Sequence, residues 1–137
     1  MQPPPQARTS IYRRVVDYVD SDQSGVVHHS AYFRYLEAAR IDLLEARGLC
    51  YARMEREQRL GLPVVEAQLW YRSPARCGDA LVALSWIGLL TAARLCVETN
   101  LEHEGRLVLE ARITLACVDL RTGRARRLPE QLRTALG

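Results

Sequence analysis

Between residues 31 and 47, apolar side chains recur at spacings of three and four positions, which is the pattern of an amphipathic α-helix. About seventeen residues would give a helix of roughly 25 Å. Ser30 is placed to cap its start and Gly48 to end it. The apolar stripe is broad, so we expect other elements to wrap around this helix. It consists of Tyr32, Leu36, Ala39, Leu43 and Ala46, widened by Phe33, Ile41 and Leu44.

After Pro63 the apolar period changes to two, which is typical of β-strands with one buried face. Short turn segments that contain glycine separate these strands. An earlier segment, 11–19, is rich in β-branched and aromatic residues and predicts a first strand. The later strands are predicted around residues 65–71, 81–87, 93–101 and 107–117.

The order of these elements, a strand, a long helix and then four strands, predicts an α+β fold in which one helix packs on an antiparallel sheet. Residues 50–60 are charged and suggest a short exposed helix, and the C-terminal tail suggests a final strand or short helix. Residues 1–9 contain three consecutive prolines, and we expect them to be a disordered tail. Residues 10–137 then form a single domain.

Charge and cysteine content narrow the functional classes. The net charge is +3, and all nineteen basic residues are arginines, scattered among sixteen acids. No basic run is interleaved with aromatic residues, so we do not expect a nucleic-acid partner. No apolar run is long enough for a membrane span, and no secretory signal is recognisable. We therefore expect a cytoplasmic protein whose four cysteines, without a C-x-x-C pair, are buried thiols.

The stretch from Tyr18 to Tyr32 concentrates residues with chemical potential: two aspartates, a glycine and two adjacent histidines. Asp20 and Asp22 could be turn or capping residues, and His29 could simply start the helix. In a catalytic reading, Asp22 could be a nucleophile or general base beside His29. Adjacent histidine side chains diverge and no third ligand lies near His28 and His29, so we expect no metal site.

Three motifs in the chain resemble the hot-dog-fold acyl-CoA thioesterases, in particular the Tol-Pal-associated (YbgC-type) branch and 4-hydroxybenzoyl-CoA thioesterase. They are Y18-x-D20-x-D22-x-x-G25-V26-V27-x-H29-x-x-Y32, Y35-x-E37-x-A39-R40 and Y71-R-S-P74-A75-R76-x-G-D79-x-L81. This resemblance, over most of residues 11–130, implies a long central helix wrapped by a curved antiparallel sheet of five or six strands. It also implies a bacterial homodimer or homotetramer with its active site at a subunit interface, and no cofactor.

The same resemblance implies roles for individual residues. Asp22 would be the nucleophile or the general base, His29 and Tyr18 would assist it, and backbone amides near His29 would polarise the thioester carbonyl. The residues expected along the substrate are Gly25, Val26, Val27, His28 and Tyr32. Arginine forks suit the phosphates of coenzyme A, and the candidates are Arg72, Arg76, Arg124, Arg126 and Arg127.

The resemblance therefore predicts hydrolysis of an acyl or aroyl thioester of coenzyme A, or of an acyl carrier protein. Thioester hydrolysis passes through an oxyanion, and a helix N-terminus offers free amide hydrogens where that charge develops. Two other readings remain open on the same fold. One is a hot-dog dehydratase, and the other is a non-catalytic protein that binds acyl thioesters or assists assembly.

Overall fold

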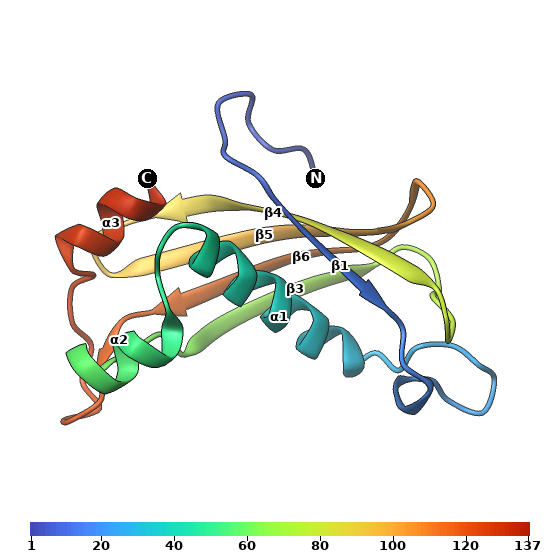
Figure 1. Ribbon diagram of the computed structural model, residues 1–137, viewed down its shortest axis with the longest axis horizontal. Helices are drawn as coiled ribbons and strands as arrows, with labels where there is room; N and C mark the ends of the chain where they lie inside the picture. Colours follow the sequence, from blue (N-terminus) through green and yellow to red (C-terminus); the bar gives the residue numbers. More distant parts are fainter.

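A curved antiparallel sheet wraps around one long helix in the computed structural model, which describes residues 1–137 (Figure 1). The five strands lie in the order β1-β4-β5-β6-β3, so β1 and β3 form the two edges of the sheet. The α+β layout predicted from the sequence is therefore confirmed. The strands are β1 (Ser10–Val15), β3 (Val64–Tyr71), β4 (Ala80–Leu90), β5 (Arg94–His103) and β6 (Arg106–Ala116).

The central helix α1 (Ala31–Ala46) lies within one residue of its predicted limits. Gly48 has φ +79°, the left-handed conformation of a residue that follows a helix. The prediction for Ser30 is wrong in one respect: it stands at the N-cap position, but its hydroxyl makes no capping hydrogen bond. Phe33 is also 47% exposed, so the buried stripe of α1 is narrower than the sequence suggests.

The inner face of the sheet supplies the other half of the core. On this face, apolar residues of neighbouring strands lie opposite one another. Leu101, for example, pairs with both Ala83 and Leu109. One polar pair interrupts this pattern, and the hydroxyls of Ser85 and Thr99 satisfy each other at 2.8 Å. The largest fully buried side chains of this core, apart from Trp86, are Tyr35, Leu36, Leu43, Leu44, Leu60, Leu95, Leu101, Leu109, Leu115, Leu128 and Val97.

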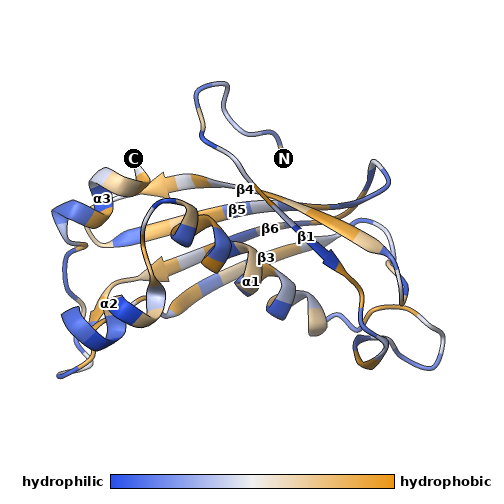
Figure 2. Cartoon of the chain, in the orientation of Figure 1, coloured by the Kyte–Doolittle hydropathy of each residue, from blue (hydrophilic) through white to orange (hydrophobic).

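Several peripheral elements differ from the expectation or add to it. The first strand ends at Val15 rather than at residue 19, because Tyr18–Asp20 forms a single 3-10 turn, η1. The short exposed helix predicted for 50–60 is α2 (Tyr51–Gln58), whose residues are mostly coloured as hydrophilic in Figure 2. The tail ends in a helix, α3 (Glu130–Leu136), and a small two-stranded sheet pairs β2 (Leu60–Gly61) with β7 (Val118–Asp119).

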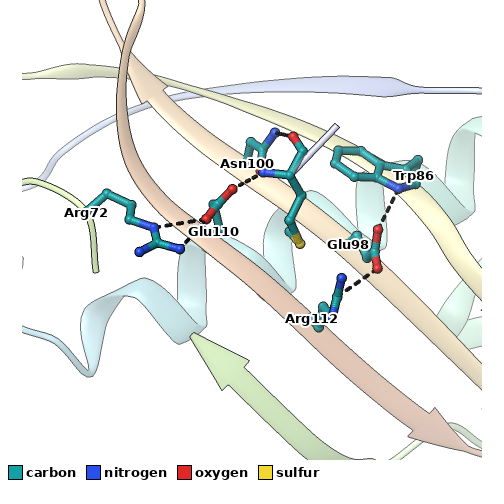
Figure 3. A network of polar contacts seen from close by, with 7 residues as sticks. Arg72, Trp86, Glu98, Asn100, Glu110 and Arg112 are labelled. Atoms are coloured by element: carbon teal, nitrogen blue, oxygen red, sulfur yellow. Dashed lines mark hydrogen bonds and ion pairs between the residues drawn. The ribbon is translucent and has the colours of Figure 1, made fainter. Parts of the chain in front are cut away.

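The outer face of the sheet carries a polar network (Figure 3). Glu98 accepts a hydrogen bond from the Trp86 indole at 2.8 Å and pairs with Arg112 at 2.9 Å. Gly88 leaves room for this carboxylate, because a Cβ there would lie 2.6 Å from Glu98 Cδ. The amine of Met1 also contacts Glu110 on this face. The disorder expected for residues 1–9 stays a prediction.

The four cysteines are free thiols, as the lack of a C-x-x-C pair suggested. The expectation that all are buried holds for Cys96 and Cys117 but is wrong for Cys77, which is exposed, and for Cys50, which is half-buried. Cys77 lies in the turn between β3 and β4, where its side chain has no neighbouring layer to cover it.

Candidate active site

The loop that precedes α1 folds back on itself as a small hairpin. Ser21 and Val27 face each other in an antiparallel bridge, and the Asp22 amide donates to the Val26 carbonyl at 2.8 Å. Gly25 closes the turn with φ +81°, and its amide donates to the Asp22 carbonyl at 2.9 Å. A side chain at this position would impose backbone strain, so the glycine is required by the turn.

Asp22 has one engaged and one free carboxylate oxygen. Its Oδ1 accepts hydrogen bonds from the hydroxyl (2.5 Å) and amide (2.8 Å) of Ser24 and from the amide of Val26 (3.2 Å). The Ser24 hydroxyl is the main cause that lowers the pKa of Asp22 below its ordinary value, and the charge of His28 adds a smaller effect. The carboxylate is therefore ionised at neutral pH and held in one orientation, while Oδ2 remains available.

Asp20 anchors this loop to α1. The residue is 5% exposed. Its carboxylate accepts a 2.6 Å hydrogen bond from the Tyr35 hydroxyl and pairs with Arg34. Its carbonyl accepts the His28 amide at 2.9 Å. On the opposite side, the Val27 amide donates to Ala75 at 2.9 Å. The hairpin is thus fixed between the helix and the turn after β3.

The start of α1 presents unused backbone donors. The amides of His29 and Ser30 have no hydrogen-bond acceptor within the chain, and the Ser30 hydroxyl does not cap the helix. Free amides at this end carry the positive pole of the helix dipole. They are therefore suited to stabilise negative charge on an oxygen atom.

These groups meet in a cavity of about 770 Å³ at the N-terminal end of α1. Seven of its lining residues come from the hairpin and the start of α1. They are Asp22, Val26, Val27, His28, His29, Ser30 and Tyr32. Gly25 does not line it and serves the turn instead. Tyr18 is 85% exposed and lies outside it, in a neighbouring depression that also contains Asp22 and His28.

The far wall of the cavity comes from the end of β3 and the turn that follows, namely Tyr71, Arg72, Ser73 and Pro74. From the sequence, Tyr71 is expected only as a strand residue at the start of the third motif. In the structure its ring stacks on the His29 imidazole, with ring centroids 4.2 Å apart and an interplanar angle of 22°. The alternation along β3 could not reveal this contact, because it depends on where the helix start lies over the sheet.

Arg72 is the one phosphate-binding candidate that lines the cavity, while Arg76 reaches the hairpin with a 3.4 Å contact to the Ser24 carbonyl. Glu110 holds Arg72 through one oxygen, Oε2, which accepts hydrogen bonds from Nη2 at 2.8 Å and Nε at 2.9 Å (Figure 3). The guanidinium is half-exposed, so one face stays accessible to an anion. Arg124, Arg126 and Arg127 belong to the opposite end of the molecule, after β7.

Comparison with known proteins decides the family. The sequence matches the thioesterase-like superfamily over residues 16–136, nearly the whole folded chain. The chain belongs to this superfamily. A long-chain acyl-CoA thioesterase, FadM of Escherichia coli, is 33% identical to this thioesterase-like chain over 112 residues, which cover 80% of the chain and 83% of FadM. A 64-residue stretch is 42% identical to an Aquifex aeolicus protein and spans 49% of its length.

Solved structures agree with this assignment. A Thermus thermophilus protein without an assigned function superposes with a TM-score of 0.88 at 41% identity, covering 93% of this chain and 96% of that one. The 1,4-dihydroxy-2-naphthoyl-CoA thioesterase of Synechocystis gives 0.87 at 26% identity, covering 94% and 96%. The predicted hot-dog arrangement of this thioesterase-like chain is confirmed. None of its helices has the length and apolarity required to cross a membrane.

Proposed function

We propose that this protein hydrolyses an acyl or aroyl thioester of coenzyme A, or of an acyl carrier protein, to the free acid and the thiol. The observation that carries the proposal is the shared cavity: the ionised carboxylate of Asp22 lies beside the unpaired amides of His29 and Ser30. A nucleophile or base and an oxyanion-binding group are the two parts that thioester cleavage requires.

Two routes use the same groups. In the first, Asp22 Oδ2 attacks the carbonyl carbon, the thiolate leaves, and water then hydrolyses the mixed anhydride to the acid and Asp22. In the second, Asp22 accepts a proton from water as the oxygen attacks the same carbon, and the thiolate leaves and is protonated. In both routes the amides of His29 and Ser30 stabilise the oxyanion. His29 polarises the carbonyl or positions the water, and Tyr18 assists from the neighbouring depression.

The cavity suggests how the substrate lies. Its apolar and aromatic lining from the hairpin and α1, which includes Val26, Val27 and Tyr32, is suited to an acyl or aroyl group. Arg72 lines the cavity and Arg76 lies against the hairpin, and both offer planar forks to phosphate oxygens of the coenzyme. Such a substrate is consistent with a cytoplasmic location and with four free thiols.

A homodimer would complete the site. The outer edge of β3 is unpaired, and most of this strand is exposed, including Val64 and Val65. Long apolar edges are normally covered in soluble proteins. A second copy pairing antiparallel at this edge would join the two sheets and bring a partner surface to the wall formed by Tyr71 and Arg72. A tetramer would need a further interface, for which the outer face of the sheet is available.

The first experiment measures free thiol release from short-chain, long-chain and aromatic acyl-CoAs. Wild type should turn over one class, and Asp22→Asn should lower kcat by at least about 100-fold because the amide neither attacks readily nor accepts a proton. His29→Ala should be slower as well. Gln23→Asn, in the same hairpin, is the matched control and should keep activity.

The same experiment separates the alternatives. Absence of thiol release from every coenzyme A and carrier-protein thioester, with retained binding, would support the non-catalytic reading. Hydration of an enoyl-CoA that depends on Asp22 would support the dehydratase. Label in the Asp22 carboxylate after a single turnover in ¹⁸O-labelled water would identify the first route, because in the second route the oxygen of water goes only to the product acid.

A further inference from the structure

The His29 imidazole is oriented by one contact only. Neither of its ring nitrogens has a hydrogen-bond partner within the chain, and the side chain is exposed toward the cavity. Its ring lies on the face of Tyr71 at 4.2 Å and 22°. The Tyr71 hydroxyl reaches the His29 carbonyl at 3.4 Å, which is long for a hydrogen bond. The stacked ring is therefore the feature that can fix the imidazole.

The backbone of His29 is held independently of Tyr71. The adjacent His28 amide donates to Asp20 at 2.9 Å, and the Val27 amide donates to Ala75 at the same distance. Loss of the Tyr71 ring would therefore leave the loop in place and free the imidazole to adopt other rotamers. This separates an effect on side-chain orientation from an effect on folding.

Tyr71 is itself a rigid platform. It is the last residue of β3 and pairs with Leu109 of β6, and the following amide, Arg72, donates to Val108 at 2.9 Å. Its ring also packs at 5.8 Å against the ring of Tyr32, which is 3% exposed. Aromatic pairs of this kind are worth about 0.5–1.5 kcal/mol beyond the area they bury. The platform is thus fixed by the sheet and by the helix.

We propose that Tyr71 is a positioning residue that holds the His29 imidazole toward the carbonyl of the bound thioester. This inference rests on the proposed function. Tyr71 acts through His29 and does not react itself, so its ring face is needed and its hydroxyl is dispensable. Displacement of a catalytic group by about 1 Å can cost on the order of 100-fold in rate, and the expected defect is in kcat rather than KM.

The test compares Tyr71→Leu, Tyr71→Phe and a matched control, Trp70→Leu. Trp70 is the preceding residue on the same strand, and its ring lies by Arg112 on the outer face of the sheet, away from His29. Tyr71→Leu should lower kcat by about 10- to 100-fold with little change in KM. Tyr71→Phe should restore most of the activity, and Trp70→Leu should retain it.

A second readout follows the His29 ring directly by NMR. The chain has three histidines, so His28→Gln, His29→Gln and His103→Gln variants assign the ring signals. A ring stacked on Tyr71 has upfield-shifted protons. Tyr71→Leu should remove this shift, whereas Tyr71→Phe and Trp70→Leu should keep it. If kcat and the His29 ring shift change together across these three variants, the result would support a positioning role for Tyr71.

Three results would overturn the inference: unchanged kcat in Tyr71→Leu, an unchanged His29 ring shift in that variant, or a Tyr71→Phe defect as large as that of Tyr71→Leu. Failure of the proposed function is distinguishable from these. If wild type hydrolyses no thioester, kinetics are lost, but the ring shift still reports whether Tyr71 orients His29. If the shift is lost while His29→Ala retains full activity, Tyr71 orients a residue that the reaction does not need, and the inference fails.

Discussion

The Tyr35 hydroxyl donates a 2.6 Å hydrogen bond to Oδ2 of Asp20, and this contact ties the loop of the candidate site to the second turn of α1. Both residues are buried, with exposed fractions of 1% and 5%. Arg34, one residue earlier on the helix, pairs with the other oxygen of the same carboxylate. Asp20 therefore places the hairpin that carries Asp22, and its role is to set geometry.

Tyr35→Phe removes this hydrogen bond without changing the ring. A bond to a charged acceptor contributes about 1.5–3 kcal/mol, so we expect the free energy of unfolding to fall by roughly 2 kcal/mol. Urea titration of the variant measures the loss. Tyr18→Phe is the matched control and should be neutral for stability, because Tyr18 is 85% exposed. Equal stability of Tyr35→Phe and wild type would show that Asp20 is not held by this contact.

Ser24→Ala should raise the pKa of Asp22. The Ser24 hydroxyl is the main group that stabilises the charged carboxylate, and its removal leaves only the backbone amides of Ser24 and Val26 on Oδ1. The proposed roles of Asp22 need the ionised form, which wild type retains down to a pH below the usual carboxylate range. In Ser24→Ala the acidic limb of kcat/KM should therefore move to higher pH.

The pH profile of kcat/KM and a carboxyl NMR titration of Asp22 check this shift. Ser21→Ala is the matched control, because its hydroxyl donates to the Tyr18 carbonyl and not to Asp22. A lowered pKa in the folded state also means that this group stabilises the fold above its unfolded pKa, and that this contribution is lost as pH falls through the folded pKa. If the acidic limb of kcat/KM does not move in Ser24→Ala, the limb does not report the ionisation of Asp22.

Gly25→Ala and Gly48→Ala form a second matched pair. Both glycines have φ near +80°, at +81° and +79°, and a Cβ at either position meets nothing closer than 3.9 Å. The strain of about 1–2 kcal/mol should therefore be similar in the two variants, as measured by chemical denaturation. Only Gly25→Ala should also lower kcat, because the hairpin that it distorts carries Asp22. Equal activity losses would point to a general effect of destabilisation.

Local patterns explain what could be predicted from the sequence. The helix predicted over 31–47, the glycine that ends it and the succession of strands along the chain depend on spacing and backbone preference, which are legible in one dimension. The stack of Tyr71 on His29 joins positions 42 residues apart and depends on how α1 lies over β3. The exposure of Tyr18 has a similar origin, since β1 ends early and η1 turns that side chain outward.

The free amides at the start of α1 were expected from helix geometry, but their availability was not. Ser30 looked like a capping residue, whose hydroxyl would accept a hydrogen bond from the amide of Tyr32 or Phe33. In the structure its hydroxyl makes no such bond, and the amides of His29 and Ser30 stay free beside the cavity. A residue type that usually stabilises a helix end here leaves that end open for a ligand.

The edge of β3 gives a test of the proposed dimer. Val65→Lys places a charge on the exposed edge strand, where such residues prevent strand pairing between chains. We expect the variant to sediment as a monomer and to lose most of its activity, because the wall carried by β3 would lack its partner. Val15→Lys is the matched control on the other edge strand, with exposed fractions of 56% for Val15 and 49% for Val65. A wild-type monomer, or a fully active Val65→Lys monomer, would contradict a site completed by a second copy at this edge.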